Sequence, residues 1–178
     1  MIISAKICPI KLCTHCNALF DVNATSPLVT TEKLVSKETV IKLSPDITAP
    51  RCVVMTTRKT FIVSYGVYWH EMNRVCEVDM NGLMLKAFGS APGKDVGQLN
   101  TPWDVSLDDE ERIIVADYLN NKVLLLNKEL MLQRVLVTWH QRHSDDAANP
   151  LRLNYDSHSG KLLVGLRHGH LDVCQLRH

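Results

Sequence analysis

The chain has 178 residues, and its 20 lysines and arginines against 19 aspartates and glutamates give a formal net charge of +1. Hydrophobic residues make up 46% of the chain, which is ordinary for a globular protein and too high for a disordered one. The charge balance gives no overall reason to expect nucleic acid, so such binding would need a local basic patch. The length suffices for one domain with its own core.

Residues 1–30 do not match the pattern found further along the chain, and we treat them as a separate N-terminal segment. Lys6 and Lys11 interrupt its apolar start, which is therefore a poor signal peptide. No run approaches the ~18 apolar residues of a transmembrane helix. We therefore expect a cytoplasmic protein without membrane contact, whose six cysteines are mostly reduced thiols.

Three cysteines and a histidine between residues 8 and 16 have a spacing that could hold zinc. Such a site needs a second ligand pair roughly 12–20 residues further on. The next cysteine is Cys52 and the next histidine is His70, so the pair is missing at that distance. We therefore expect strand or turn cysteines here, and no metal or other cofactor.

The rest of the chain contains three similar segments, which begin at Pro50, Pro102 and Pro150, about 50 residues apart. In each, a short first strand is followed by a polar turn, an apolar second strand, another turn and a third strand. The expected second strands, which are nearly all apolar as in strands covered on both faces, are residues 61–63, 113–115 and 162–164. The first two copies add a fourth strand, at residues 83–88 and 131–136.

Four antiparallel strands per repeat are the blade of a β-propeller, so the sequence predicts an all-β partial propeller of three to four blades. Asn81-Gly82 is a strong signal for a tight hairpin between the third and fourth strands of the first copy. Residues 39–46 look like the third strand and turn of an earlier blade. The expected units, after the N-terminal segment 1–30, are a partial blade at about 31–48 and blades at 49–90, 101–138 and 149–178.

The residues that carry a family resemblance lie mainly in the second copy. They are Gly97-Gln98-Leu99, Pro102, Asp104-Val105, Ile114-Val115-Ala116-Asp117 and Asn121-Lys122-Val123. This pattern resembles the NHL repeat, most closely over 97–138, and the arrangement is similar to the C-terminal propeller of tripartite-motif proteins. The resemblance implies a platform that binds a substrate or RNA, often attached to a ubiquitin-ligase RING domain.

The chain departs from that family in two ways. At about 45 residues per blade it supplies three to four blades, whereas propellers have ~4–8. This predicts a fragment or a degenerate copy; pairing of two copies into one ring is the alternative. The chain also lacks the paired Cys and His ligands of a RING, so any ligase activity would lie outside it.

Binding residues are expected in the loops of one face, which connect the second and third strands and link one blade to the next. These loops concentrate aromatic and basic side chains, the composition of protein-binding hot spots and of single-stranded RNA readers. The candidates are Tyr68, Trp69, His70, Lys94, Tyr118, Arg142, His143, Arg167 and His168.

Two motifs have both a chemical and a structural interpretation. His168-Gly169-His170 could chelate a metal, but its place in the repeat predicts a turn between strands. Asp117 could serve as a general acid or base, but the other copies keep the strand and lose the acid. We therefore expect Asp117 to cap a turn through hydrogen bonds to the backbone.

The sequence thus leaves several functions open. The first is a non-catalytic module that binds a protein partner, and the second is RNA binding on the same face. An enzyme is a third hypothesis, because some propellers with NHL-like repeats hold a metal in the central channel and act as lyases. That would require histidines at equivalent positions in several blades, and none recurs here, so we expect no enzyme and no small-molecule substrate. The fourth is a propeller fragment without independent function.

Overall fold

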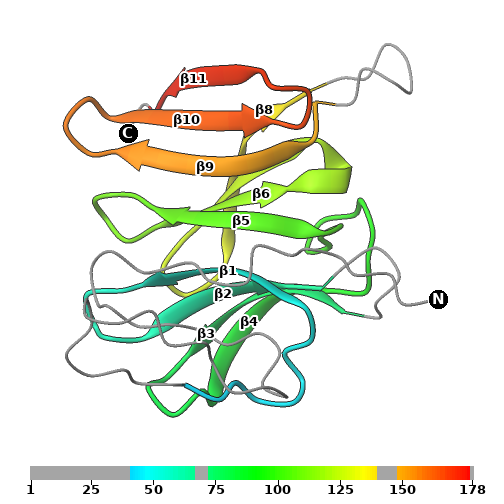
Figure 1. Ribbon diagram of the computed structural model, residues 1–178, viewed down its shortest axis with the longest axis vertical. Coiled ribbons are helices and arrows are strands. Elements are labelled where there is room, and N and C mark those ends of the chain that lie inside the picture. Colours follow the sequence, from blue (N-terminus) through cyan, green and yellow to red (C-terminus); the bar gives the residue numbers. More distant parts are fainter. Residues whose placement is uncertain (1–40, 67–71, 140–147, 177–178) are drawn as a thin grey trace, which may run out of the picture.

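A computed structural model describes residues 41–66, 72–139 and 148–176, which form three antiparallel sheets stacked side by side (Figure 1). Blade 1 contains β1 (Pro50–Met55), β2 (Phe61–Tyr65), β3 (Asn73–Val78) and β4 (Met84–Ser90). Blade 2 contains β5 (Pro102–Leu107), β6 (Ile113–Asp117), β7 (Lys122–Leu126) and β8 (Leu132–Thr138), with a 3-10 turn η1 (Tyr118–Asn120). Blade 3 contains β9 (Pro150–Asp156), β10 (Lys161–Leu166) and β11 (Leu171–Gln175).

Within each blade, strands that follow one another in the chain are neighbours in the sheet. The predicted all-β fold of antiparallel, propeller-type blades is therefore confirmed, with three strands rather than four in blade 3 among the described residues. No helix in residues 41–66, 72–139 or 148–176 has the length and hydropathy to span a membrane.

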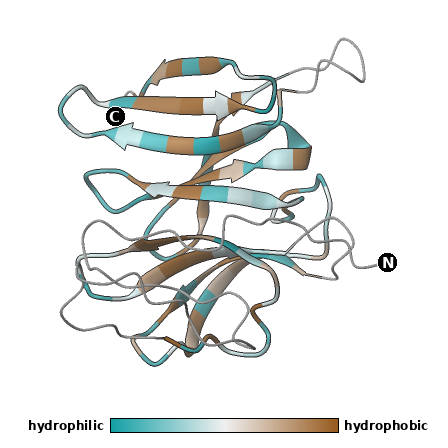
Figure 2. Ribbon diagram, in the orientation of Figure 1, coloured by the Kyte–Doolittle hydropathy of each residue, from teal (hydrophilic) through white to brown (hydrophobic). Residues whose placement is uncertain are grey.

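Two hydrophobic cores lie between the sheets, because neighbouring blades bury the faces that they turn toward each other. Every residue of β2 and of β6 is buried, as expected for strands covered on both sides. Ile62 and Val75 of blade 1 pack with Val105 of blade 2, while Ile114 of blade 2 packs with Leu162 of blade 3. Figure 2 shows the hydrophobic residues concentrated in the strands and the hydrophilic ones in the turns.

The outer face of blade 1 is covered by the segment that precedes β1. Ile41 and Ile47 of this segment are buried against Phe61 and Val78. Residues 41–48 contain a turn but no strand, so the part of the expected earlier blade that the structure describes is a cover and not a sheet.

The predicted hairpin between β3 and β4 is confirmed. Its turn runs from Asp79 to Gly82, and the N–H of Gly82 donates to the carbonyl of Asp79 at 3.0 Å. Gly82 has a φ of +81°, and a Cβ there would lie 2.0 Å from the carbonyl oxygen of Lys42. Both the conformation and the close approach therefore require glycine at this position.

In blades 1 and 2, an asparagine at the start of the third strand, or just before it, links the blade to the next one. The side-chain oxygen of Asn73 accepts from the N–H of Thr101 at 2.7 Å, and that of Asn121 accepts from Asn149 at 2.9 Å. Thr101 and Asn149 each precede the proline that begins a blade, and both have positive φ values, of 58° and 42°. The hydrogen bond therefore holds the blade entrance in an unfavourable conformation.

We expect Asn121→Ala to lower the free energy of unfolding by about 1–3 kcal/mol, because it leaves the buried N–H of Asn149 without its acceptor. Urea unfolding followed by circular dichroism measures this loss. Asn81→Ala is the matched control, since Asn81 is exposed and its side chain bonds to Asp79 within its own hairpin. An equal loss in both variants would contradict the linking role of Asn121.

Candidate functional site

The connections between second and third strands and the links between blades meet at one edge of the three sheets. We call this edge the loop face; its described residues are 48–51, 66, 91–103, 118–121, 148–151 and 167–169. Backbone hydrogen bonds hold it together in all three blades. They are Gly66 N to Thr48 O at 3.1 Å, Leu119 N to Asn100 O at 3.0 Å and Arg167 N to Ala148 O at 3.2 Å.

A stack of three side chains joins blades 1 and 2 on the loop face. The guanidinium carbon of Arg51 lies 4.0 Å from the centre of the Trp103 ring, which is within cation–π range. The Trp103 and Tyr118 rings are tilted by 39°, with their centres 4.9 Å apart. Partial burial lowers the pKa of Arg51 from its ordinary value, but an arginine remains charged at neutral pH. The stack therefore presents a cation on an aromatic platform.

The repeat explains how Arg51 and Trp103 reach this position. Each follows the proline that begins a first strand, and a register shift leaves each without a partner on the neighbouring strand. Bulges of this kind redirect a side chain at the edge of a sheet. The same position in blade 3 is Leu151, so blade 3 contributes neither a cation nor an aromatic ring there.

The structure places four of the nine predicted site residues on the loop face. Tyr118 belongs to the stack, whereas Lys94, Arg167 and His168 are exposed loop residues. The loop of Lys94 is tied to blade 2, because the side-chain amide of Asn120 donates to the carbonyl of Gly93 at 2.7 Å. The other five, Tyr68, Trp69, His70, Arg142 and His143, lie outside the described residues.

Sequence reasoning missed Arg51 and Trp103 as candidates for the site. The prediction from the sequence confined the binding residues to loops, whereas Arg51 and Trp103 lie in the first strands β1 and β5. The available signal was the repeat itself, since the residue after Pro50 and after Pro102 is large and planar in both copies.

Asp117 has the structural position that the repeat predicted. Its carboxylate accepts from the N–H of Asn100 at 2.7 Å and from the side chain of Asn120 at 2.8 Å, and Lys122 lies 3.5 Å away. Burial raises the pKa of Asp117 to about 6, against the opposing effect of these partners. Asp117 thus fastens the link before β5 to the end of β6.

The two histidines beside Gly169 occupy a turn, as the repeat also predicted. The N–H of Gly169 donates to the carbonyl of Leu166 at 3.2 Å, and both histidines are exposed. Within the described parts of the chain, no three His, Cys, Asp or Glu side chains gather closely enough to hold a metal ion.

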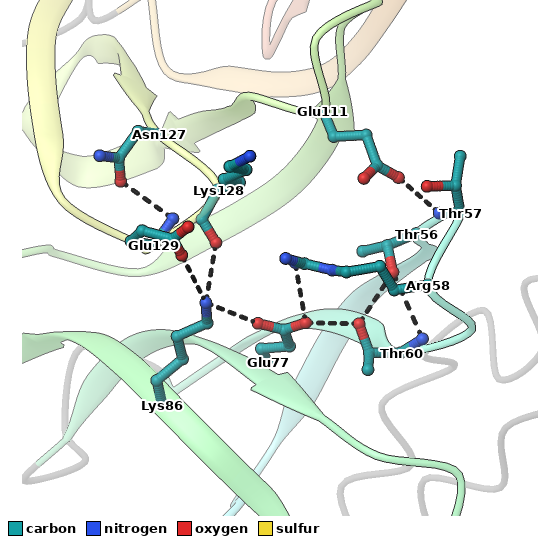
Figure 3. A network of polar contacts seen from close by, with 10 residues as sticks. All are labelled: Thr56, Thr57, Arg58, Thr60, Glu77, Lys86, Glu111, Asn127, Lys128 and Glu129. Atoms are coloured by element: carbon teal, nitrogen blue, oxygen red, sulfur yellow. Dashed lines mark hydrogen bonds and ion pairs between the residues drawn. The ribbon is translucent and has the colours of Figure 1, made fainter.

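A polar network lies at the opposite edge, among the hairpin turns (Figure 3). The buried carboxylate of Glu77 contacts Arg58 at 3.1 Å and Lys86 at 3.0 Å. Lys86 also contacts Glu129 of blade 2 at 2.9 Å. Burial opposes the charge of Lys86, but Glu129 and Glu77 together raise its pKa above the ordinary value. We interpret this network as a clamp between blades 1 and 2, since its groups satisfy one another.

Comparison with known proteins supports the fold. No protein-family profile matches the chain. The chain is similar to a catalytically inactive variant of virginiamycin B lyase from Staphylococcus aureus, solved with quinupristin, at 11% identity and a TM-score of 0.51. That match covers 78% of this chain and 45% of the lyase. A protein of unknown function from Bacteroides caccae matches at 14% identity and a TM-score of 0.50, covering 72% of this chain and 42% of that one.

The lyase is a β-propeller-like protein, so the likeness supports a propeller fold for this chain. At these identities it shows the fold alone. The chain spans less than half the length of either matched structure. The chain is therefore a partial propeller by fold, which agrees with the arrangement of its three blades.

The raised pKa of Asp117 predicts a pH dependence of stability. The ordinary pKa of an aspartate is 3.8, and the pKa of Asp117 in the folded chain is about 6. At a pH between these two values, Asp117 therefore keeps a proton in the folded chain that it releases in the unfolded chain. This contribution to stability is complete below about pH 3.8 and is lost progressively as the pH rises from there through about 6. The measurement is the melting temperature of the native chain minus the melting temperature of the Asp117→Asn variant. We expect this difference to be larger at about pH 5 than at about pH 7.5. A difference that is constant with pH would contradict this assignment.

Proposed function

We propose that the chain is a non-catalytic interaction module that binds a protein partner or substrate through its loop face. The observation that carries the proposal is the stack of Arg51, Trp103 and Tyr118, which joins two blades on that face. Tryptophan, tyrosine and arginine are the residues most enriched in binding hot spots. Here they are held together before any partner arrives, which lowers the entropic cost of binding.

The rigidity of the stack supports the same proposal. The bulges of β1 and β5 position Arg51 and Trp103, and the Nε of Arg51 also donates to the carbonyl of Gly66 at 3.5 Å. Exposed Lys94 and Arg167 lie in the surrounding loops, where they can form the polar rim of an interface. The resemblance to tripartite-motif proteins suggests that the partner is recruited for ubiquitination by a ligase domain outside this chain.

RNA is the second candidate ligand, and the same stack favours it. Single-stranded RNA readers combine aromatic platforms with cations that follow the phosphates. The overall charge of +1 argues for the protein partner, because phosphate contacts dominate RNA affinity.

We expect Trp103→Ala to weaken partner binding by about tenfold or more, because it removes the centre of the stack. Proximity labelling with the full chain in cells would identify partners, and calorimetry with a purified partner would measure the loss. Arg51→Ala should weaken the same partners, whereas Leu85→Ala, at an exposed residue of β4, should weaken none. Partners that are labelled equally by all three variants would contradict the proposal.

A labelled twelve-nucleotide uridine oligomer separates protein binding from RNA binding. If the loop face reads RNA, its affinity will fall steeply between about 50 and 200 mM salt, and Trp103→Ala will weaken it. If the face binds protein, the oligomer will bind weakly and Trp103→Ala will not change that binding.

The third alternative is a propeller fragment with no function of its own. Three sheets with extensive cores between them should unfold cooperatively, so we expect a monomer with a single thermal transition. Light scattering and circular dichroism of the purified chain measure both properties. Aggregation without a transition would favour the fragment, and a cooperative dimer would indicate that two copies complete one ring.

A further inference from the structure

Arg51 of the loop face is a half-buried cation, and no ion pair of the described residues includes it. Two other half-buried cations do have an acidic partner. Arg112, whose side chain is 16% exposed, contacts the carboxylate of Asp108 at 2.6 Å. Lys122, whose side chain is 17% exposed, contacts the carboxylate of Asp117 at 3.5 Å. Burial has therefore removed part of the water around the charge of Arg51 without supplying an anion in its place.

The guanidinium group of Arg51 is held in place but keeps one side free. Its carbon lies 4.0 Å from the centre of the Trp103 ring, and its Nε donates to the carbonyl of Gly66 at 3.5 Å. The two terminal nitrogens donate to no described residue and are not shut off from water. They therefore form a free planar fork, which matches the two oxygens of a carboxylate.

The aromatic rings of the stack cannot replace the missing anion. The face of a tryptophan ring attracts a cation, but it has no oxygen to accept hydrogen bonds from the terminal nitrogens. The stack lies between blades 1 and 2, whose four strands each are described, so it does not depend on blade 3. A carboxylate that reached Arg51 would gain two charge-assisted hydrogen bonds at a site that is already arranged to donate them.

The distribution of charge also favours an acidic partner at the loop face. The described residues of this face include three cations, Arg51, Lys94 and Arg167, and one anion, Asp95. The hairpin turns of the opposite edge contain seven aspartates and glutamates and four lysines and arginines. These turns are residues 56–60, 79–83, 108–112, 127–131 and 156–160. An acidic segment is therefore attracted to the loop face more than to the opposite edge.

We propose that the loop face binds an acidic segment of a partner protein, in which an aspartate or glutamate carboxylate accepts hydrogen bonds from both terminal nitrogens of Arg51. An apolar residue next to this acid packs against the Trp103 and Tyr118 rings. Exposed Lys94 and Arg167, in the surrounding loops, attract further acidic residues of the segment. This inference rests on the proposed function, since it names the chemistry of the protein partner that the loop face binds.

RNA would bring phosphates instead of carboxylates, and the described face suits it less well. A strand of RNA carries a phosphate at every nucleotide, so proteins that bind it follow the strand with a groove of cations. Of the three described cations of the loop face, Arg51 is the one that is held on an aromatic ring. One fixed fork suits one planar carboxylate. RNA binding is therefore the outcome for which the uridine oligomer serves as a test.

The probe is a fluorescein-labelled peptide, Gly-Asp-Leu-Glu-Leu-Asp-Gly, whose binding to the full chain is followed by fluorescence anisotropy. We expect saturable binding below about 1 mM. The control peptide has glutamine in place of the glutamate, which keeps the shape of the side chain and the flanking acids. It should bind about fivefold more weakly, because a neutral amide offers the fork one oxygen instead of two charged ones.

The matched protein variants are Arg51→Lys and Arg58→Lys, which keep the charge and remove the planar fork at opposite edges of the sheets. We expect Arg51→Lys to weaken binding of the acidic peptide about fivefold. Arg58→Lys should leave the binding unchanged, since Arg58 belongs to the clamp with Glu77. The comparison of the two peptides on the native chain keeps the test valid if Arg51→Lys fails to fold.

Four results would overturn the proposal. They are the absence of saturable binding, equal binding of the glutamate and glutamine peptides, equal binding by the Arg51→Lys and Arg58→Lys variants, and a uridine oligomer that binds more tightly than the peptide and is weakened by Arg51→Lys. The fourth would mean that the loop face reads phosphates.

Proximity labelling separates the failure of this inference from the failure of the proposed function. If Trp103→Ala loses the partners of the native chain while the peptides show none of the expected differences, the loop face binds partners of another chemistry and the inference alone fails. If the labelled partners are also the same in every variant, both fail.

Discussion

The packing of one sheet against the next is the interaction on which the rest of this structure depends. A sheet of four short strands has two faces, and alone it would expose both of them to water. In this chain the second strands lie in the middle of each blade and are buried on both sides in blades 1 and 2. Hydrophobic contact between blades is therefore the main source of stability.

Polar contacts fix how the blades are placed after hydrophobic packing has brought them together. At the loop face, Asn73 and Asn121 each hold the entrance of the following blade. At the opposite edge, Glu77 and Lys86 connect blade 1 to Glu129 of blade 2. Apolar side chains alone would allow one sheet to slide over the next. Hydrogen bonds and ion pairs form only at particular distances and angles, so they select one relative position of the two sheets.

The three blades repeat the same strands, but they differ in the side chains at equivalent positions of the loop face. Arg51 and Trp103 occupy equivalent bulges, and they meet because neighbouring blades are placed side by side. Blade 3 has Leu151 at that position and Gly169 where the other blades have the linking asparagine. Blade 3 therefore preserves the strands of the repeat while losing the groups that would join it to a following blade.

The sequence by itself determined the strands and their order. The prolines at 50, 102 and 150 begin first strands, the apolar runs form central strands, and Asp117 fastens a turn as its place in the repeat predicted. These features are local, because alternation, turn residues and proline act over a few neighbouring positions. The similarity between the three copies then indicated which strand is the first, second or third of its blade.

Only the tertiary structure decided which side chains of different blades meet. The contact between Arg51 and Trp103 and the cover that Ile41 and Ile47 provide for blade 1 both join residues distant in the chain. No periodic pattern records such contacts, because they depend on the angle and spacing of neighbouring sheets. That geometry is set by the packing of whole blades, which no single segment of the sequence contains.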